Sequence, residues 1–116
     1  LVRDDSRLGA SWASACEIIR GDLAEPKFLE SAVEGVDVVF HCAANVSTWA
    51  VWEEYQQANV NGVQNLINAI ARVNSGLSRL VHVSTVDVYG YPVLPASEDS
   101  TTHDAEFGYG ESKRQG

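Results

Sequence analysis

The chain has 116 residues, of which 45% are hydrophobic, and its 16 acidic and 8 basic residues give a formal net charge of −8. This length and hydrophobic content indicate one globular domain and exclude an intrinsically disordered chain. The acidic balance repels phosphate backbones and argues against a general nucleic-acid-binding surface. Apolar runs fall well short of the roughly 20 residues that cross a bilayer, so we expect no membrane segment.

The first half of the chain alternates β-favouring and helix-favouring segments. Residues 16–20 form a short β-favouring run, and residues 1–3 look like the end of an earlier strand. Pro26 suits the first turn of a helix that Gly35 ends. The apolar face of this helix comprises Phe28, Leu29, Ala32 and Val33. Residues 36–44 form an almost continuous apolar strand, typical of a parallel sheet buried on both faces.

The second half continues the same alternation. A long helix is expected over residues 52–74. Its apolar face comprises Val60, Val63, Leu66, Ile67 and Ile70. Residues 79–85 form another buried strand, which a turn and a polar loop follow, and a final helix begins at Tyr109. The order of strands and helices predicts an α/β fold, a doubly wound parallel sheet of the Rossmann-like kind in partial form.

The two cysteines have no CxxC partner and stand in apolar surroundings. Cys16 and Cys42 are therefore predicted to be buried thiols in a reducing compartment, which favours a cytoplasmic protein. Alternation along a strand sends His41 and Cys42 to opposite faces, and no cluster has zinc-like spacing, so no metal site is expected.

Tyr109 and Lys113 are four residues apart, so a helix places them on one face. A nearby ammonium favours the phenolate form of a phenol, which would let Tyr109 act as a general acid or base near neutral pH. This spacing alone occurs in many chains, and a surface tyrosine beside a surface lysine is the alternative.

Further candidates follow the predicted strands, where ligands of open α/β sheets bind. Ser84 and Thr85 could hydrogen-bond a substrate carbonyl or alcohol, or could only satisfy backbone groups. Asp22 could accept a hydrogen bond from an exocyclic amine, although a helix N-cap uses the same residue type. Ala43 and Ala44 admit a bulky ligand or, alternatively, simply pack closely.

A polar cluster stands inside the long helix, where Asn and Gly cost stability. It comprises Asn59, Asn61, Gly62 and Asn65. We expect a neighbouring polar site or contact with a neighbouring backbone to compensate for this cost.

Taken together and in order, these segments resemble the extended short-chain dehydrogenase/reductase family, also called the NAD(P)-dependent epimerase/dehydratase family. The resemblance covers nearly the whole chain and is nearest to the branch with 3β-hydroxysteroid dehydrogenases and dihydroflavonol reductases. The segments that carry it are Gly21-Asp22-Leu23, residues 35–44, Asn59-Val60-Asn61-Gly62, Val83-Ser84-Thr85 with Val88-Tyr89-Gly90, and Tyr109 with Lys113.

The resemblance implies an NAD(P)-dependent oxidoreductase that moves a hydride between nicotinamide and a carbon bearing a hydroxyl or keto group. Tyr109 would be the catalytic acid/base, and Lys113 would favour its phenolate and bind the nicotinamide ribose. Thr85, supported by Ser84, would match the catalytic Ser/Thr of the family. Asn59 would match the helix asparagine that supports the proton relay.

The resemblance also implies how the cofactor would lie. Asp22 would contact the adenine amine, with Leu23 beside the ring. The segment Cys42-Ala43-Ala44 would pass along the phosphates and ribose, and Val46 would lie nearer the nicotinamide. We expect NADP or NAD, with NADP slightly favoured, because Arg3 and Arg7 suit a 2′-phosphate while Asp4 and Asp5 favour NAD.

The sequence departs from the family pattern in two places. It shows neither the glycine-rich loop that places a pyrophosphate at a helix N-terminus nor the C-terminal substrate region, and it contains no methionine. We therefore expect residues 1–116 to be a partial NAD(P)-binding Rossmann domain that lacks the first βα unit. The function would belong to a longer enzyme, and the isolated chain would be inactive.

The expected substrate is a small molecule of the steroid, flavonoid or related carbonyl class. A nucleotide-sugar epimerase is the alternative enzyme. A non-catalytic dinucleotide-binding regulator is the alternative from another class, although such relatives usually lose the Tyr/Lys pair. The family often dimerises through paired helices, so a second copy of the chain is a further candidate partner.

Overall fold

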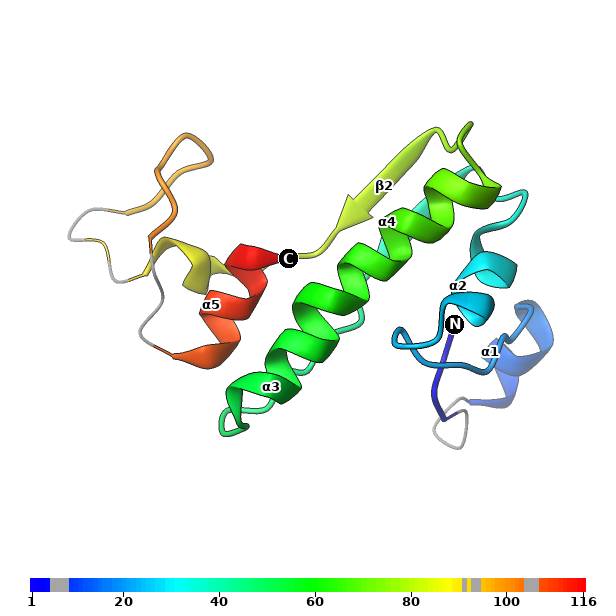
Figure 1. Ribbon diagram of the computed structural model, residues 1–116, viewed down its shortest axis with the longest axis horizontal. Helices are drawn as coiled ribbons and strands as arrows, with labels where there is room; N and C mark the ends of the chain where they lie inside the picture. Colours follow the sequence, from blue (N-terminus) through cyan, green and yellow to red (C-terminus); the bar gives the residue numbers. More distant parts are fainter. Residues whose placement is uncertain (5–8, 91, 93–94, 104–106) are drawn as a thin grey trace.

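The computed structural model describes residues 1–4, 9–90, 92, 95–103 and 107–116, without the side chains of residues 10, 12 and 13. Asp5 and Arg7, which bear on cofactor choice, lie outside the described residues. The described chain is elongated, with extents of 46 × 32 × 27 Å (Figure 1). None of its helices is long and apolar enough to cross a membrane.

Two parallel strands form the described sheet. Strand β1 (Val38–His41) pairs with β2 (Arg79–His82) in a register that places His41 beside His82. The backbone bonds Ser78 N to Asp37 O (3.0 Å) and Val83 N to His41 O (3.0 Å) extend the ladder at both ends. The pairing confirms the predicted parallel α/β arrangement, although both strands are shorter than the sequence pattern suggested.

The connection between the two strands is one long helical segment. It consists of α3 (Trp52–Tyr55), the π-helix η1 (Gln56–Asn61) and α4 (Gly62–Val73). In Figure 1 this segment runs diagonally across the molecule, with α4 beside β2. The predicted helix over residues 52–74 is thus confirmed, except that its middle is wound as a π-helix.

The hydrophobic core lies between this connection and α2 (Pro26–Val33). Its buried members are Leu29, Val33, Leu66 and Ala69, with Leu23, Val39, Ile70, Val73 and Leu80 packed around them. The side chain of Asn74 donates to Val33 O at 2.8 Å and to Val36 O at 2.7 Å. It thereby fixes the end of α4 to the turn between α2 and β1.

The expectation of a sheet buried on both faces is wrong for the described residues. Phe40 is 71% exposed and Val38 is 41% exposed, whereas the alternate residue His41 is only 5% exposed. Helices α2 and α4 cover one face of β1, and the described chain supplies no layer over the other. The predicted burial of Cys42 fails for the same reason, and Cys16 is exposed as well; both thiols are free.

The amino-terminal segments meet without forming a full strand pair. Val2 and Arg20 form an isolated parallel bridge, supported by Val2 N to Ile19 O and Gly21 N to Val2 O, both 2.9 Å. The predicted strand at residues 16–20 is therefore reduced to one bridge beside residue 2. A short helix, α1 (Ala10–Ala15), was not predicted.

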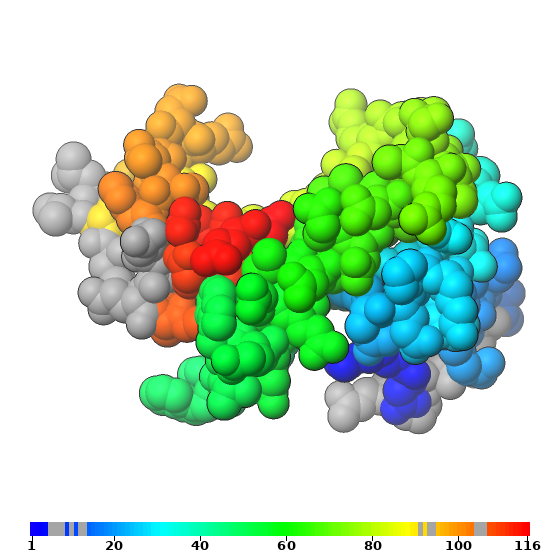
Figure 2. Space-filling model, in the orientation of Figure 1, coloured from blue at the N-terminus to red at the C-terminus, as the bar shows by residue number. Residues whose placement is uncertain are grey.

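The carboxyl-terminal part forms a separate lobe at the end of β2. It contains the 3-10 helix η2 (Val86–Tyr89) and α5 (Gly108–Gln115). Helix α5 packs against η1 and η2, and Figure 2 shows it pressed against the long helical connection. The predicted final helix is confirmed, and it lies close to the point where β2 ends.

Candidate active site

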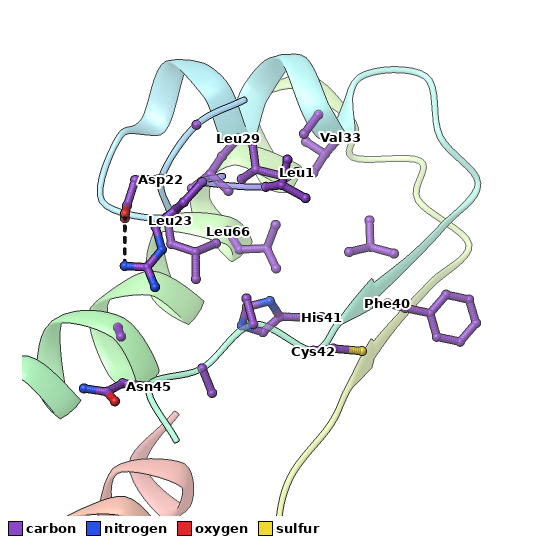
Figure 3. Close-up of a pocket in the computed structure, with 18 of the residues that line it drawn as sticks. Leu1, Asp22, Leu23, Leu29, Val33, Phe40, His41, Cys42, Asn45 and Leu66 are labelled. Carbon is purple, nitrogen blue, oxygen red and sulfur yellow. Dashed lines mark ion pairs between the residues drawn. The ribbon is translucent and has the colours of Figure 1, made fainter. Parts of the chain in front are cut away.

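One cavity of about 1310 Å³ is lined by residues 1–4, by residues 21–23, and by β1 with the segment that follows it. Its wall also includes core side chains such as Leu29 and Leu66, but no residue of β2. The cavity exceeds the roughly 300–1,000 Å³ of a typical small-molecule pocket. Seven of the eight residues predicted to bind a dinucleotide line it, and they come from three separate stretches of the chain (Figure 3). These residues are Arg3, Asp22, Leu23, Cys42, Ala43, Ala44 and Val46. The eighth, Lys113, lies outside the cavity wall.

Asp22 and Arg3 both line the cavity, and the dashed line at Asp22 in Figure 3 marks their ion pair. Arg3 Nη1 lies 3.8 Å from Asp22 Oδ2, with side-chain exposures of 81% and 41%, so this ion pair contributes little to stability. Asp22 Oδ1 accepts from Ala24 N at 2.9 Å. The first helical residue of α2 is Pro26 and its N-cap is Glu25, so Asp22 shapes the preceding turn rather than capping the helix.

Leu23 is held in place by the long helical connection. Asn65 Nδ2 donates to Leu23 O at 2.9 Å. Gly62 lies so close that a Cβ there would stand 3.1 Å from two carbons of the Leu23 side chain. Two members of the polar cluster thus fix the loop that carries Asp22 and Leu23.

Asn59 performs the same task for the next loop. Its side chain is 1% exposed, accepts from Asn45 N at 2.7 Å and donates to Asn45 O at 3.0 Å. It also donates to Ser112 Oγ at 2.8 Å, which ties η1 to α5. Single π turns within helices are frequent at functional sites. The expected compensation is confirmed for Asn59 and Asn65, whose amides hold neighbouring backbone, whereas Asn61 is exposed.

Helix α5 carries Tyr109 half-buried and Lys113 almost fully buried, at 5% exposure. Ser112 Oγ donates to Tyr109 O at 2.7 Å and fixes the first turn. Lys113 Nζ lies 3.1 Å from His82 Nε2, at the end of β2. Lysine is seldom buried unless it has a partner, so the alternative of a surface lysine at this position is wrong.

His41, His82 and Lys113 form a cluster of three basic groups. The two imidazole centroids lie 5.2 Å apart. Burial, with smaller contributions from His82 and Lys113, lowers the pKa of His41 to about 4. Burial also lowers the pKa of His82 and that of Lys113. The lowered pKa values favour the neutral form of both imidazoles at pH 7.

Thr85 and Ser84 follow directly on β2. Thr85 Oγ1 donates to Asp87 Oδ2 at 2.8 Å and caps η2 by accepting from Asp87 N, so one lone pair remains for a ligand. Ser84 is exposed. Among the described contacts none joins the Tyr109 hydroxyl to Thr85 or Lys113. The structure places these groups on adjoining elements, since α5 packs against η2.

Several residues of this site were not assigned a role from the sequence. Asn45 and Ser112 are the partners of Asn59, and His82 is the partner of Lys113. The available signals were weak: Ser112 lies three residues after Tyr109, and His82 lies two residues before Ser84. The described residues contain no group of three or more His, Cys, Asp or Glu side chains arranged to hold a metal ion.

The residues present fit a dinucleotide in three respects. The small side chains of Ala43 and Ala44 let a ligand approach the backbone where β1 ends. Arg3 supplies a cation on the cavity wall, beside Asp22. His41, which projects from β1 on the cavity wall, keeps a buried Nε2 without a partner among the described atoms (Figure 3). Such an unpaired buried nitrogen is expected where a polar ligand group or ordered water completes the site.

The chain is similar in sequence to several known proteins. The chain is 41% identical over 92 residues to a 2-alkyl-3-oxoalkanoate reductase of Stenotrophomonas maltophilia, covering 77% of the chain and 27% of that protein. It is 34% identical over 79 residues to a 3 beta-hydroxysteroid dehydrogenase/Delta 5-->4-isomerase of Mycobacterium tuberculosis, covering 62% of the chain and 21% of that protein. The chain thus spans about a quarter of the length of these relatives.

A solved structure of UDP-glucuronic acid 4-epimerase from Bacillus cereus in complex with NAD is similar as well. It superposes with a TM-score of 0.71 at 30% identity, covering 84% of this chain and 30% of that one. This similarity confirms the Rossmann-like fold class. Residues 2–116 also match the sequence profile of one family across their full extent. The chain therefore belongs to the NAD dependent epimerase/dehydratase family.

Proposed function

We propose that this chain is a partial NAD(P)-binding Rossmann domain, and that it carries the catalytic Tyr/Lys pair of a longer oxidoreductase. The enzyme would transfer a hydride between nicotinamide and a carbon that bears a hydroxyl or keto group. One observation carries the proposal: seven residues predicted to bind a dinucleotide, from three stretches of the chain, line a single cavity.

The proposed cofactor is NADP or NAD, with a slight preference for NADP. Asp22 and Leu23 would receive the adenine end. Cys42, Ala43 and Ala44 would follow the phosphates and ribose, and Val46 would approach the nicotinamide. Arg3 on the cavity wall supports NADP, while the facing Asp22 offsets part of its charge. Turnover of the whole protein with each cofactor measures the preference.

The proposed mechanism gives each polar residue one task. Tyr109 would exchange a proton with the substrate oxygen. Thr85 would accept a hydrogen bond from the substrate hydroxyl, and exposed Ser84 would support it. Lys113 would hold the nicotinamide ribose and favour the phenolate of Tyr109, and Asn59 would support the relay by fixing Ser112. The bound nicotinamide supplies or accepts the hydride.

The proposed substrate is a small carbonyl compound or secondary alcohol of the steroid or flavonoid type or a related one. The relatives named a reductase and a hydroxysteroid dehydrogenase support this class. A nucleotide-sugar epimerase is the second candidate, favoured by the likeness to a UDP-glucuronic acid 4-epimerase. Assays of the whole protein on a keto steroid and on a UDP-sugar distinguish the two.

We also propose a cytoplasmic protein that pairs with a second copy of itself. The two free thiols support a reducing compartment. The proposed pairing rests on the family resemblance, in which paired helices form the dimer.

The substitution Tyr109→Phe in the whole protein tests the proposed function. We expect turnover to fall by at least about a hundredfold, as for loss of a general acid or base, while the cofactor Kd stays within about twofold. Unchanged turnover would contradict the role of Tyr109. A protein that binds the dinucleotide but turns over no tested carbonyl or sugar, in either form, would instead be a non-catalytic regulator.

A further inference from the structure

Lys113 is the one buried lysine among the described residues, and its described hydrogen-bond partner is His82. We infer that His82 is a positioning residue: its Nε2 accepts one N–H of the Lys113 ammonium and so directs the other two toward a bound ribose. This inference rests on the proposed function, because it assigns Lys113 to the cofactor.

The geometry of an ammonium group supports this role. Lys113 Nζ has three N–H donors, and the 3.1 Å contact to His82 Nε2 uses one of them. The two remaining donors diverge at a tetrahedral angle, which suits two adjacent hydroxyl groups of a ribose. Without the His82 acceptor, rotation about the Cε–Nζ bond and the flexible four-carbon stem would leave these directions undefined.

The surroundings of His82 keep it in the form that can accept. Its ring lies on β2 beside His41 of β1, and Lys113 of α5 contacts its Nε2. Neither ring is easily protonated next to a buried ammonium, since burial and the Lys113 charge both lower the pKa of His82. Cys42, which follows β1, is the other titratable group near Lys113, and it favours the charged lysine.

A neutral His82 that accepts at Nε2 must carry its proton on Nδ1. This nitrogen is buried and has no partner among the described atoms. Because Nδ1 has no partner, no second hydrogen bond among the described atoms fixes the tautomer of the His82 ring. The bond to Lys113 is then what determines the tautomer, and this makes the inference measurable without any turnover.

The first test is nitrogen-15 NMR of the unmodified protein at neutral pH. We expect His82 to be the Nδ1–H tautomer, and the Lys113 ammonium to give a signal protected from rapid solvent exchange. A proton on Nε2 of His82 would overturn the inference. This test needs neither cofactor nor substrate, so its failure is distinct from failure of the proposed function.

The second test uses three variants of the whole protein, His82→Phe, His82→Gln and the control His103→Gln. Phe keeps the ring without an acceptor, and we expect the cofactor KM to rise about tenfold with kcat within about threefold. Gln restores an acceptor, and the KM should return to within about threefold of the unmodified protein. His103 is exposed and lies before α5, 21 positions after His82, so the cofactor KM and kcat of its variant should match those of the unmodified protein.

The kinetic outcomes separate positioning from simple packing. If Phe and Gln change KM equally in folded protein, or if Phe changes neither KM nor the Lys113 signal, His82 does not position the lysine. If the Phe variant does not fold, the Gln variant and the tautomer of the unmodified protein decide. If Tyr109→Phe leaves turnover intact while the His82 tautomer is as expected, the proposed function fails and the His82–Lys113 contact stands.

Discussion

Asn59 shows how one buried side chain organises the site. Its amide makes three hydrogen bonds, two to the backbone of Asn45 and one to Ser112 Oγ. These bonds connect the loop after β1, the π-helix and α5. Asparagine destabilises the interior of an isolated helix, but here its side chain supports the surrounding tertiary structure. Asn59 is the buried residue of the π-helix.

The substitution Asn59→Ala tests this role. It removes the partner of the half-buried Asn45 backbone and of the buried Ser112 hydroxyl, and we expect the free energy of unfolding to fall by roughly 2–4 kcal/mol. The matched control is Asn61→Ala in the same π-helix, where the side chain is exposed and the expected change is within about 0.5 kcal/mol. Urea unfolding measures both. Equal changes in the two variants would contradict the role of the buried amide.

His41 predicts a pH dependence of stability. Its pKa is lowered from 6.5 to about 4, so the unfolded chain takes up a proton at a higher pH than the folded chain. The free energy of unfolding should fall as the pH drops from about 6.5 to about 4, by on the order of 2–3 kcal/mol, and this group adds no loss below that range. The lowered pKa of His82 acts in the same direction.

Urea unfolding at pH 7 and pH 4.5 checks this dependence. The variant His41→Leu removes the titrating group, so the difference between the two pH values should be smaller than in the unmodified chain. Comparing differences within each protein cancels any effect of Leu on packing. An unchanged difference would show that His41 is not the group that links protonation to unfolding.

At the scale of elements, close packing between α2 and the segment of residues 16–21 depends on Gly21. A Cβ at this position would lie 2.5 Å from Phe28 Cβ and Cγ, a distance that requires the helix or the strand end to move. Because Asp22 and Leu23 follow directly, this contact also sets one wall of the cavity.

We therefore expect Gly21→Ala to lower the free energy of unfolding by about 1–3 kcal/mol, as overpacking does. Gly76→Ala is the control, since no atom lies within 4 Å of its Cβ position and its backbone needs no special conformation. Urea unfolding of both variants tests the prediction. A Gly21→Ala chain as stable as the Gly76→Ala chain would show that Phe28 can give way.

The elements also show which features a sequence pattern reveals. The helix face through Leu66 was predictable, because regular periodicity reflects burial. The apolar run predicted the position of β1 but not its burial, since Phe40 is 71% exposed. Ile67 was assigned to the same face but is 44% exposed, while Ala69 is buried at 3%. Helix α2 packs on the side of α4 that carries Ala69. The spacing of apolar residues does not show on which side a helix packs against its neighbour.

The exposure of Phe40 and the reduction of residues 16–20 to one bridge have a related cause. β-favouring residues form strands only where a partner strand and covering layers are present. In the described chain β1 is covered on one face, and Arg20 has a single bridge partner in Val2. The candidate site residues could be proposed from the sequence because strand ends and the Tyr/Lys spacing are local features, and their roles stay a prediction. The His82–Lys113 contact, by contrast, joins β2 to α5 across 31 positions.

At the scale of the whole molecule, the cavity and the α5 lobe are connected by a few polar contacts. Asn59 ties the loop that follows β1 to α5, and His82 ties β2 to Lys113. The proposed cofactor would therefore extend from the Asp22 end of the cavity toward this lobe. The central claim is that one ligand contacts both the loop after residues 16–20 and the loop after β1. Backbone hydrogen exchange of the whole protein tests this claim most directly.

Exchange should be measured with and without a saturating concentration of NADP. We predict slower exchange in the peptides that contain residues 21–24 and 42–47, and unchanged exchange in residues 95–103, which lie outside the cavity lining. Protection confined to one of the two loops, or protection that appears only in segments away from the cavity, would contradict a dinucleotide site at this position.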